Sequence, residues 1–449
     1  MPIFKLERQT VVDLAADGYG VLRPTDAPAV LVPFTIEGEM VDVRITHRKR
    51  QLWYGEAVAW HVVSPQRTEP KCADFGRCGG CRWQMMSYTH QLYHKRRFVE
   101  QALHHIAHIP LSVPPVIPSP QLWRYRNKAE YTFGLSPSGE VTLGFHPRGD
   151  FARVLPIQHC WLVPEVFEVV RTAVLHEAQK LKLKPYDPRT HQGLLRSLLV
   201  RGTAEEVIAL LSLSQDDPTV AQALFAPVRS LLKGYGYFHN PKRNDSIHDL
   251  EPHVIEGSLT LSYTVGDRQY RLGPKDFFQV NLVQAEAALS WIRSRLESRI
   301  PVLYDLYGGV GFFGVGLADL AKEVYLIEKL PHAAQSAAQN FSLNRSKYPQ
   351  TAWHVAAGNV EDVLPAHIQK PEQAVAIVDP PREGLHPKLR TYLLQSRFAQ
   401  IIYISCHPAT QARDLADLKS AYDVIKIQPF DFFPHTTSIE NIVILRCRG

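Results

Sequence analysis

The stretch Val302-Leu303-Tyr304-Asp305-Leu306-Tyr307-Gly308-Gly309-Val310-Gly311-Phe312-Phe313 decides the fold of this chain. An apolar run, expected to be a strand over 302–306, ends in a glycine-rich turn, and a helix is expected over 313–321. Glycines at such a turn let the backbone approach a ligand at a helix N-terminus. Apolar runs at 324–327, 375–378 and 401–404 continue the pattern between helical segments. This alternation predicts a parallel sheet in a Rossmann-like α/β domain over 266–449.

Polar residues follow the expected strands. Glu328 lies at the position of an acid that grips ribose hydroxyls in a dinucleotide-type fold. Asn359 and Asp362 follow the third strand, where they are either adenine contacts or simple cap residues. Asp379 begins Asp-Pro-Pro-Arg at the end of the fourth strand, and two prolines make a stiff loop that holds its carboxylate in place.

The spacing of the glycines bears on the ligand. Gly308-Gly309-Val310-Gly311 is not the G-x-G-x-x-G pattern of a NAD site, and nothing else in the sequence suggests hydride transfer. S-adenosylmethionine (SAM) also has a ribose for Glu328 to hold, and it needs no pyrophosphate cradle. SAM is therefore the favoured ligand over a nicotinamide nucleotide.

Tyr403–Leu415 reads Y-I-S-C-H-P-A-T-Q-A-R-D-L and carries the candidate nucleophile. Cys406 follows an apolar strand and precedes Pro408, which suits the first turn of a helix. A thiol at the carboxyl end of a parallel strand, beside a helix N-terminus, is placed to be a thiolate. The alternative for a single free cysteine is a buried small hydrophobe.

Two further domains precede the α/β domain. Five short strands separated by Gly or Pro signals over 1–64 predict a small OB-like β-barrel, a type of domain that often binds single-stranded nucleic acid. Residues 65–265 alternate irregularly and predict a central α+β domain, with an amphipathic helix around 88–107. Basic groups at 44–50, 94–97 and 124–128 are interleaved with aromatics, which suits RNA, although solvated surface is the alternative for any one group.

Four cysteines form a metal-type pattern, Cys72-x5-Cys78-x2-Cys81 with a distant Cys160. Gly79-Gly80 supply the tight turn that ligation requires. Zinc and an iron–sulfur cluster both accept four thiolates, and the spacing does not choose between them.

Bulk properties describe an ordinary protein of two or three domains. The chain has 449 residues and a formal net charge of +6, which is mild. No apolar stretch reaches the length of a membrane span, and the N-terminus lacks a signal-peptide pattern. We expect a cytoplasmic monomer with no membrane partner.

Together these residues resemble the RNA 5-methyluridine methyltransferases, most closely the 23S rRNA (uracil-5-)-methyltransferase branch. The similarity covers nearly the whole chain. Its matching pieces are 277–281, 305–311, Glu328, 379–384, 405–414, Pro434-His435-Thr436 and Glu440.

The resemblance implies a role for each matched position. Cys406 becomes the nucleophile and Glu440 the base. Cofactor contacts fall on residues of the strand ends and the glycine turn: Gln279, Tyr307, Glu328 and Asp379, to which we add Phe312 and Asn359. The N-terminal barrel resembles a TRAM domain, and Cys72, Cys78, Cys81 and Cys160 match the cysteines of a [4Fe–4S] cluster.

The chain departs from the family pattern at four positions. His407 stands where Asn usually follows the nucleophile, and Gly308 where Cys is common. Phe312 replaces a small polar residue, and Ser438 replaces a His two positions before the base.

The sequence therefore predicts SAM-dependent methylation of uridine carbon-5 in 23S rRNA. Three rival readings remain: the same chemistry on tRNA, an amine methyltransferase that uses Asp379-Pro380-Pro381, and a silent RNA-binding factor. Phe277 and Phe278 are either pocket residues for a flipped uracil or plain core.

Overall fold

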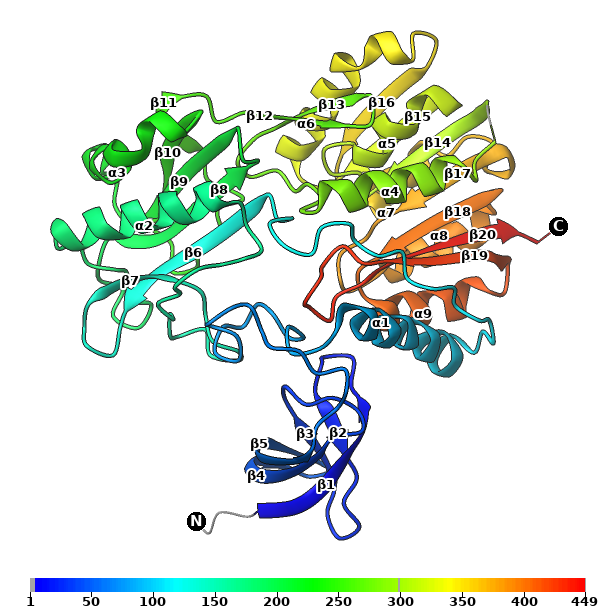
Figure 1. The fold of residues 1–449 in the computed structure, drawn as a ribbon. Coiled ribbons are helices and arrows are strands. Elements are labelled where there is room, and N and C mark those ends of the chain that lie inside the picture. Colours follow the sequence, from blue (N-terminus) through cyan, green and yellow to red (C-terminus); the bar gives the residue numbers. More distant parts are fainter. Residues whose placement is uncertain (1–4, 298, 449) are drawn as a thin grey trace.

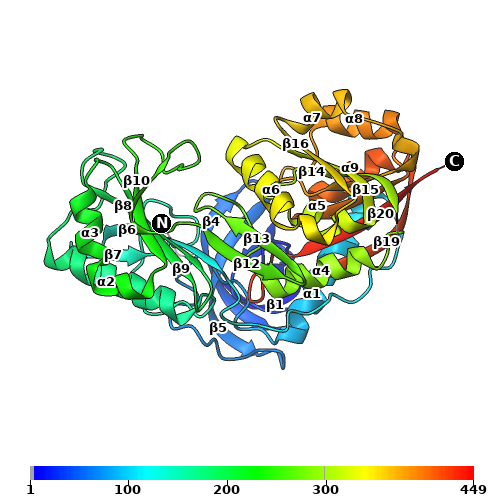
Figure 2. The ribbon, with the colours of Figure 1, turned by 90° about the horizontal axis from the view of Figure 1, so that it is seen from above.

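The computed structural model describes residues 5–297 and 299–448. Three main sheets, one in each of three lobes, and one two-stranded sheet organise the described chain (Figure 1). A small barrel lies below two larger lobes, which stand side by side, and the view from above shows the same arrangement (Figure 2). None of the described helices is long and apolar enough to cross a membrane.

The N-terminal barrel is closed, with strand order β1-β2-β3-β5-β4. Its strands are β1 (Lys5–Leu14), β2 (Gly20–Leu22), β3 (Ala29–Val32), β4 (Met40–Lys49) and β5 (Leu52–Val62). Alternate side chains point inward, and Trp83, Met86 and Phe98 from the following segment complete its core. The predicted five-stranded barrel is confirmed.

The central lobe is a six-stranded mixed sheet of order β11-β10-β9-β8-β6-β7, as expected of an α+β domain. Its elements are β6 (Lys128–Leu135), β7 (Val141–Gly144), α2 (Glu165–Lys180), β8 (Leu195–Gly202), β9 (Val207–Leu213), α3 (Pro218–Phe225), β10 (Gly234–His239) and β11 (Pro252–Gly257). Helices α2 and α3 cover one face. The other face shares a core with the C-terminal lobe, which joins the two lobes firmly.

The C-terminal sheet has seven strands in the order β16-β15-β14-β17-β18-β20-β19. They are β14 (Ile300–Leu306), β15 (Ala321–Glu328), β16 (Ala352–Ala357), β17 (Ala374–Val378), β18 (Gln400–Ser405), β19 (Tyr422–Phe430) and β20 (Glu440–Cys447). The first five are parallel and β20 is antiparallel to its neighbours. Strand order reverses at β14 and β17, which makes their carboxyl ends the switch point where ligands bind.

Helices cover both faces of this sheet because successive residues of each strand point to opposite sides. In β14, Leu303 joins one core, and Val302 and Tyr304 join the other. One core includes α4 (Leu282–Arg293), α5 (Phe312–Leu317) and α6 (Pro331–Leu343). The opposite core includes α1 (Tyr88–Ala102), α7 (Val360–Val363), α8 (Pro387–Ser396) and α9 (Pro408–Leu418).

Helix α1 differs from its expected place in a central domain over 65–265. Its apolar side chains, such as Val99 and Ala102, pack in the C-terminal lobe beside α9. The expected boundary at 265 and 266 also falls inside the hairpin of β12 (Leu261–Val265) and β13 (Arg268–Leu272). Periodicity shows that a helix is amphipathic, but it does not show which sheet its apolar face will meet.

Candidate active site

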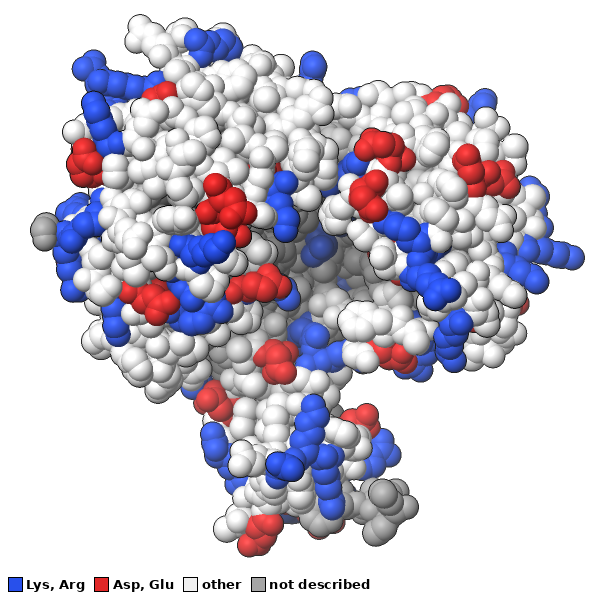
Figure 3. Space-filling view, turned by 180° about the vertical axis from the view of Figure 1, so that it is seen from behind, with Lys and Arg blue, Asp and Glu red and all other residues white. Residues whose placement is uncertain are grey.

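A cleft of about 1410 Å³ lies at the carboxyl ends of the C-terminal strands. In the space-filling view a hollow opens between the two large lobes, with basic side chains in and around it (Figure 3). Seven of the eight residues predicted for catalysis and cofactor binding line the cleft: Gln279, Tyr307, Glu328, Asn359, Asp379, Cys406 and Glu440. Residues far apart in the sequence therefore converge on one space.

Glu328 is held rigidly at the end of β15. Its Oε2 accepts the Gly309 N–H at 3.0 Å and its Oε1 accepts the Leu330 N–H at 2.8 Å. Each carboxylate oxygen keeps a second lone pair for a ligand hydroxyl. Asn359 stands at the N-cap position of α7 nearby without a side-chain capping bond, and its Nδ2 donates to Asp362 Oδ2 at 3.1 Å. This end of the cleft therefore fits a ribose and an adjoining base.

The glycine turn is shaped by its backbone. Tyr307 has a φ of 62° and Gly311, at the start of α5, a φ of 85°. A left-handed tyrosine costs about 1–3 kcal/mol and is typical of functional sites. A Cβ on Gly308 would lie 2.5 Å from Leu326 Cγ. Leu326 thus occupies the space of the cysteine that is common at position 308 in similar proteins.

Phe312 does not belong to the cleft, so its prediction as a cofactor contact is wrong for the side chain. It is 6% exposed, and its ring contacts Tyr270, Phe278 and Phe313 in the core. The reason is helical geometry: a residue at the first position of α5 can direct its side chain back into the sheet core, and only its backbone faces the glycine turn.

The aromatic pair before Gln279 divides between two environments. Phe277 is 68% exposed and lines the cleft, whereas Phe278 is buried in the core. Asn127 fixes this segment, because its Nδ2 donates to the Gln279 carbonyl at 2.9 Å and its N–H to Val280 at 3.2 Å. This contact gives a structural role to the basic segment around Asn127.

Cys406 directly follows β18, at the carboxyl end of a parallel strand as predicted, but its thiol is not prepared as a thiolate in the free protein. Burial raises the pKa of the Cys406 thiol to about 11, and the neighbouring Glu440 adds to the rise. Arg382 opposes it. The expectation of a thiolate was wrong for this state because desolvation and two nearby carboxyls outweigh the helix N-terminus.

The helix after the nucleophile explains one departure from the family pattern. His407 is the N-cap of α9, and its Nδ1 accepts the Thr410 N–H at 3.3 Å. An asparagine side chain makes the same kind of cap, so His407 preserves the function of the usual residue. Pro408 occupies the first turn, as predicted.

Asp379 and Glu440 form the acidic side of the catalytic end. Burial raises the pKa of Asp379 to about 7, with a further rise from the neighbouring Asp305. Burial also raises the pKa of Glu440 well above its usual value, and Asp379 adds to the rise while Arg382 opposes it. Both carboxyls therefore bind a proton more readily than an exposed carboxyl does.

Asp414 of α9 joins the loops that carry Asp379 and Cys406. Its Oδ2 accepts the Leu385 N–H at 2.7 Å and the Tyr403 hydroxyl at 2.6 Å, and its Oδ1 accepts from Arg390 at 2.8 Å. The Asp414 side chain is fully buried. One carboxylate thus fixes the spacing between two strand-end loops.

The four predicted metal cysteines, Cys72, Cys78, Cys81 and Cys160, line a second cavity of about 690 Å³. Cys81 lies within electrostatic reach of the other three thiols. Among the described residues, no three or more His, Cys, Asp or Glu side chains are arranged to hold a single metal ion. This cavity shares Gly79, Gly80, Arg82 and Arg126 with the cleft, so the cysteines lie behind one wall of the site.

Five of the described arginines line the cleft, and none was assigned a catalytic or cofactor-binding role from the sequence. Arg382 lies beside Cys406 and Glu440, and Arg82 and Arg126 line the wall shared with the cysteine cavity. Arg382 follows the Asp-Pro-Pro signature and Arg82 follows Cys81, so adjacency to a motif was the available signal. Such cations suit the phosphates of a nucleic acid.

Comparisons with known proteins agree with this geometry. The family model described as tRNA (Uracil-5-)-methyltransferase matches residues 252–448. An RNA methyltransferase of Bacteroides thetaiotaomicron, described as uncharacterized, is 33% identical over 97% of this chain and 100% of its own length. One from Porphyromonas gingivalis is 33% identical over 97% of this chain and 98% of its own.

A solved structure shares the fold throughout. It is the Pyrococcus abyssi tRNA (uracil-54, C5)-methyltransferase in complex with S-adenosyl-L-homocysteine, with a TM-score of 0.76 and 24% identity over 98% of this chain and 100% of that one. The cleft at the switch point and the full-length relatives lead to one conclusion: the chain belongs to a family of RNA methyltransferases and is an enzyme of that class.

Proposed function

We propose that this enzyme methylates uridine carbon-5 in 23S rRNA, with Cys406 as nucleophile and Glu440 as base. The observation that carries the proposal is the convergence of Cys406, Asp379 and Glu440 in the cleft that also holds Glu328. A thiol nucleophile, a carboxylate base and an acid that can hold a ribose are the groups that this reaction requires.

The first step is the addition of Cys406 to uracil carbon-6. The thiol proton passes to Asp379, whose pKa of about 7 lets it hold a proton near neutrality. Arg382 stabilises the thiolate. A sulfur–carbon bond forms, and the electron pair of the carbon-5–carbon-6 double bond moves onto the enolate, which makes carbon-5 nucleophilic.

The second step needs a methyl group and a base. SAM supplies the methyl group as an electrophilic sulfonium, and Glu328, Asn359, Tyr307 and Gln279 are placed to hold it. After transfer, Glu440 removes the carbon-5 proton, the double bond re-forms, and the Cys406 thiolate leaves carbon-6. A base lost at this point leaves the RNA covalently attached to the protein.

The target atom lies inside a base stack, so the uridine must be flipped or unpaired. Phe277, exposed in the cleft, offers a stacking surface for it. On the barrel, the Arg48 guanidinium lies 4.5 Å from the centre of the Trp53 ring and Lys49 lies 5.7 Å from that of Tyr54. We propose a TRAM-like role for this barrel in binding single-stranded RNA.

The substrate has an alternative. The barrel and the cysteines favour 23S rRNA, whereas the description of the matching family model names tRNA. Likeness to the Pyrococcus abyssi structure at 24% identity extends to the fold and does not choose between them. We also propose that the enzyme works in the cytoplasm as a monomer.

We propose an iron–sulfur cluster in preference to zinc at the four cysteines, because both accept four thiolates and the family resemblance favours the cluster. Four thiols around one cavity suit a [4Fe–4S] cluster, whose several atoms fill the space between them. We propose that the cluster supports the wall of the cleft at Gly79 and Gly80.

Transfer of labelled methyl groups from SAM to unmodified bacterial rRNA and tRNA tests the proposal. We expect 5-methyluridine in rRNA, and a loss of more than about 10³-fold in Cys406→Ala. Cys447→Ala is the matched control and should retain activity. Label in tRNA alone would identify tRNA as the substrate in place of rRNA. A fully active Cys406→Ala enzyme would exclude the covalent mechanism.

A further inference from the structure

We propose that Gln91 and Lys95 of α1 are positioning residues for Glu440: they hold the loop between β19 and β20 in the shape that turns the carboxylate toward Cys406. The inference rests on the function proposed above, in which Glu440 is the base. Neither Gln91 nor Lys95 is among the residues that line the cleft, so their influence on the reaction passes through the loop.

The loop over 431–439 forms one wall of the catalytic end. Phe433, Thr436 and Ser438 line the cleft, and Glu440 follows directly. His435 in its middle has a φ of 66°. A histidine keeps this left-handed conformation only where its surroundings determine it, so something outside the loop must fix its shape.

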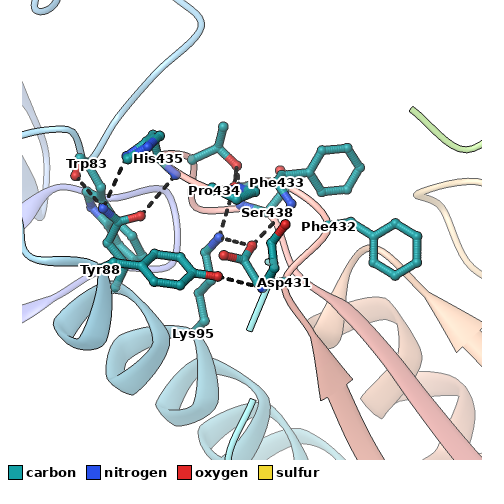
Figure 4. A network of polar contacts seen from close by, with 12 residues as sticks. Trp83, Tyr88, Lys95, Asp431, Phe432, Phe433, Pro434, His435 and Ser438 are labelled. Carbon is teal, nitrogen blue, oxygen red and sulfur yellow. Dashed lines mark hydrogen bonds and ion pairs between the residues drawn. The ribbon is translucent and has the colours of Figure 1, made fainter. Parts of the chain in front are cut away.

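Lys95 fixes the start of the loop. Its Nζ lies 2.6 Å from Asp431 Oδ1 and donates to the Phe433 carbonyl at 3.0 Å. The same Asp431 oxygen accepts the Phe433 N–H at 3.1 Å. Both side chains are 0% exposed, and the close-up shows the pair enclosed between the helix and the loop (Figure 4). Both backbone groups of Phe433 are thereby held by one buried ion pair.

Gln91 fixes the middle of the loop. Its side-chain oxygen accepts the His435 N–H at 2.9 Å, and its amide donates to the carbonyls of Trp83 and Met86, each at 2.9 Å. The His435 carbonyl in turn accepts the Arg82 and Trp83 N–H groups at 2.9 and 3.1 Å. Hydrogen bonds therefore hold both the backbone N–H and the carbonyl of the strained His435.

Stacking closes the remaining side. The Trp123 ring lies 3.9 Å from the His435 ring, centre to centre, with 22° between their planes. Tyr125 donates to the carbonyl of Pro434 at 3.1 Å. The loop that precedes Glu440 is thus bound by three separate segments, and among the contacts named here on the described residues Lys95 of α1 is the only charged partner.

A purely stabilising role makes a different prediction from a positioning role. Replacing a buried ion pair with apolar residues of similar volume is often neutral or stabilising for the fold. Methionine and leucine cannot bind the backbone of Phe433, however. The double variant Lys95→Met/Asp431→Leu therefore separates the two roles, because it restores packing without restoring the constraint on the loop.

The experiment compares melting temperature, steady-state methylation and the fraction of protein covalently bound to RNA. For Lys95→Met/Asp431→Leu we expect a melting temperature near that of the unmodified protein, methylation slower by between about tenfold and 10²-fold, and accumulated Cys406–RNA adduct. Addition and methyl transfer use groups on other loops, so the adduct is the signature of a misplaced base. A double variant that is as stable as the unmodified protein and methylates RNA at the normal rate would overturn the inference.

Two controls complete the test. Arg268→Met/Asp319→Leu removes a largely buried ion pair behind α5 and should give no adduct. Glu440→Gln should trap the adduct by itself. If Glu440→Gln instead releases product at the normal rate, the proposed base is wrong. If Glu440→Gln traps adduct and the Lys95/Asp431 variant does not, only the positioning role fails.

Discussion

Glu328 and the pair Asp379–Glu440 face the same cleft, but the protein treats their charges in different ways. Glu328 accepts two backbone N–H groups, which satisfy its charge before any ligand arrives. Asp379 and Glu440 both line the cleft and influence each other electrostatically, and the pKa of each carboxyl is raised. The cofactor end is thus preorganised for binding, whereas the catalytic end keeps carboxyls in an unfavourable environment where a proton can be exchanged.

Removal of the Glu328 carboxylate should weaken cofactor binding. In Glu328→Ala the Gly309 and Leu330 N–H groups lose their acceptor and the ligand loses its ribose contact. We expect SAM affinity to fall by about 10–100-fold, as for loss of a charged hydrogen bond, when measured by calorimetry. Glu323→Ala, on the same strand but away from the cleft, is the control. Unchanged affinity in Glu328→Ala would place the ribose elsewhere.

At the catalytic end, removal of a carboxyl should increase the stability of the fold. Because burial raises the pKa of Asp379 from 3.8 to about 7, its contribution to stability is fully present below pH 3.8 and is lost as pH rises through 7. Asp379→Asn cannot ionise, so at pH 8 it should be more stable than the unmodified protein by on the order of 2 kcal/mol. Chemical denaturation at pH 5 and pH 8 measures the difference.

The matched control is the exposed Glu383→Gln in the same loop, for which we expect no change of stability between the two pH values. A gain for Asp379→Asn that is equal at both pH values would show that packing, and not charge, is responsible. The predicted gain in stability is smaller than the full pKa shift of Asp379 would give, because Asp379 and Glu440 share the free-energy cost of ionisation.

The smallest effect on stability is expected at His407, the N-cap of α9. His407→Asn should leave stability within about 0.5 kcal/mol, because either side chain can accept the Thr410 N–H. His407→Ala should cost about 1 kcal/mol. Thermal melts of the two variants decide this, and equal losses would show that the ring, not the cap, matters at this position.

Much of the fold could be predicted because the C-terminal strands are continuous apolar runs that end in polar residues. That pattern locates the ends of β14, β15, β17 and β18, and therefore most of the cleft. Family resemblance supplied Gln279 and Glu440, which lie outside those strand ends.

Other features depend on tertiary contacts that a local pattern does not contain. The packing of α1 beside α9 and the pairing of Lys95 with Asp431 join segments more than 300 positions apart. The direction of the Phe312 side chain depends on where the core lies. The protonation of Cys406 depends on burial, which no spacing of residues reveals.

The position of β20 has a consequence for synthesis of the protein. This strand is made after β18 and β19, yet it lies between them in the sheet. Until residues 440–447 leave the ribosome, β18 and β19 cannot be joined and each presents an open strand edge. The strand that closes the sheet also brings Glu440, so a nascent or truncated chain ending before residue 440 has two exposed edges for aggregation and lacks the base that we propose for RNA release.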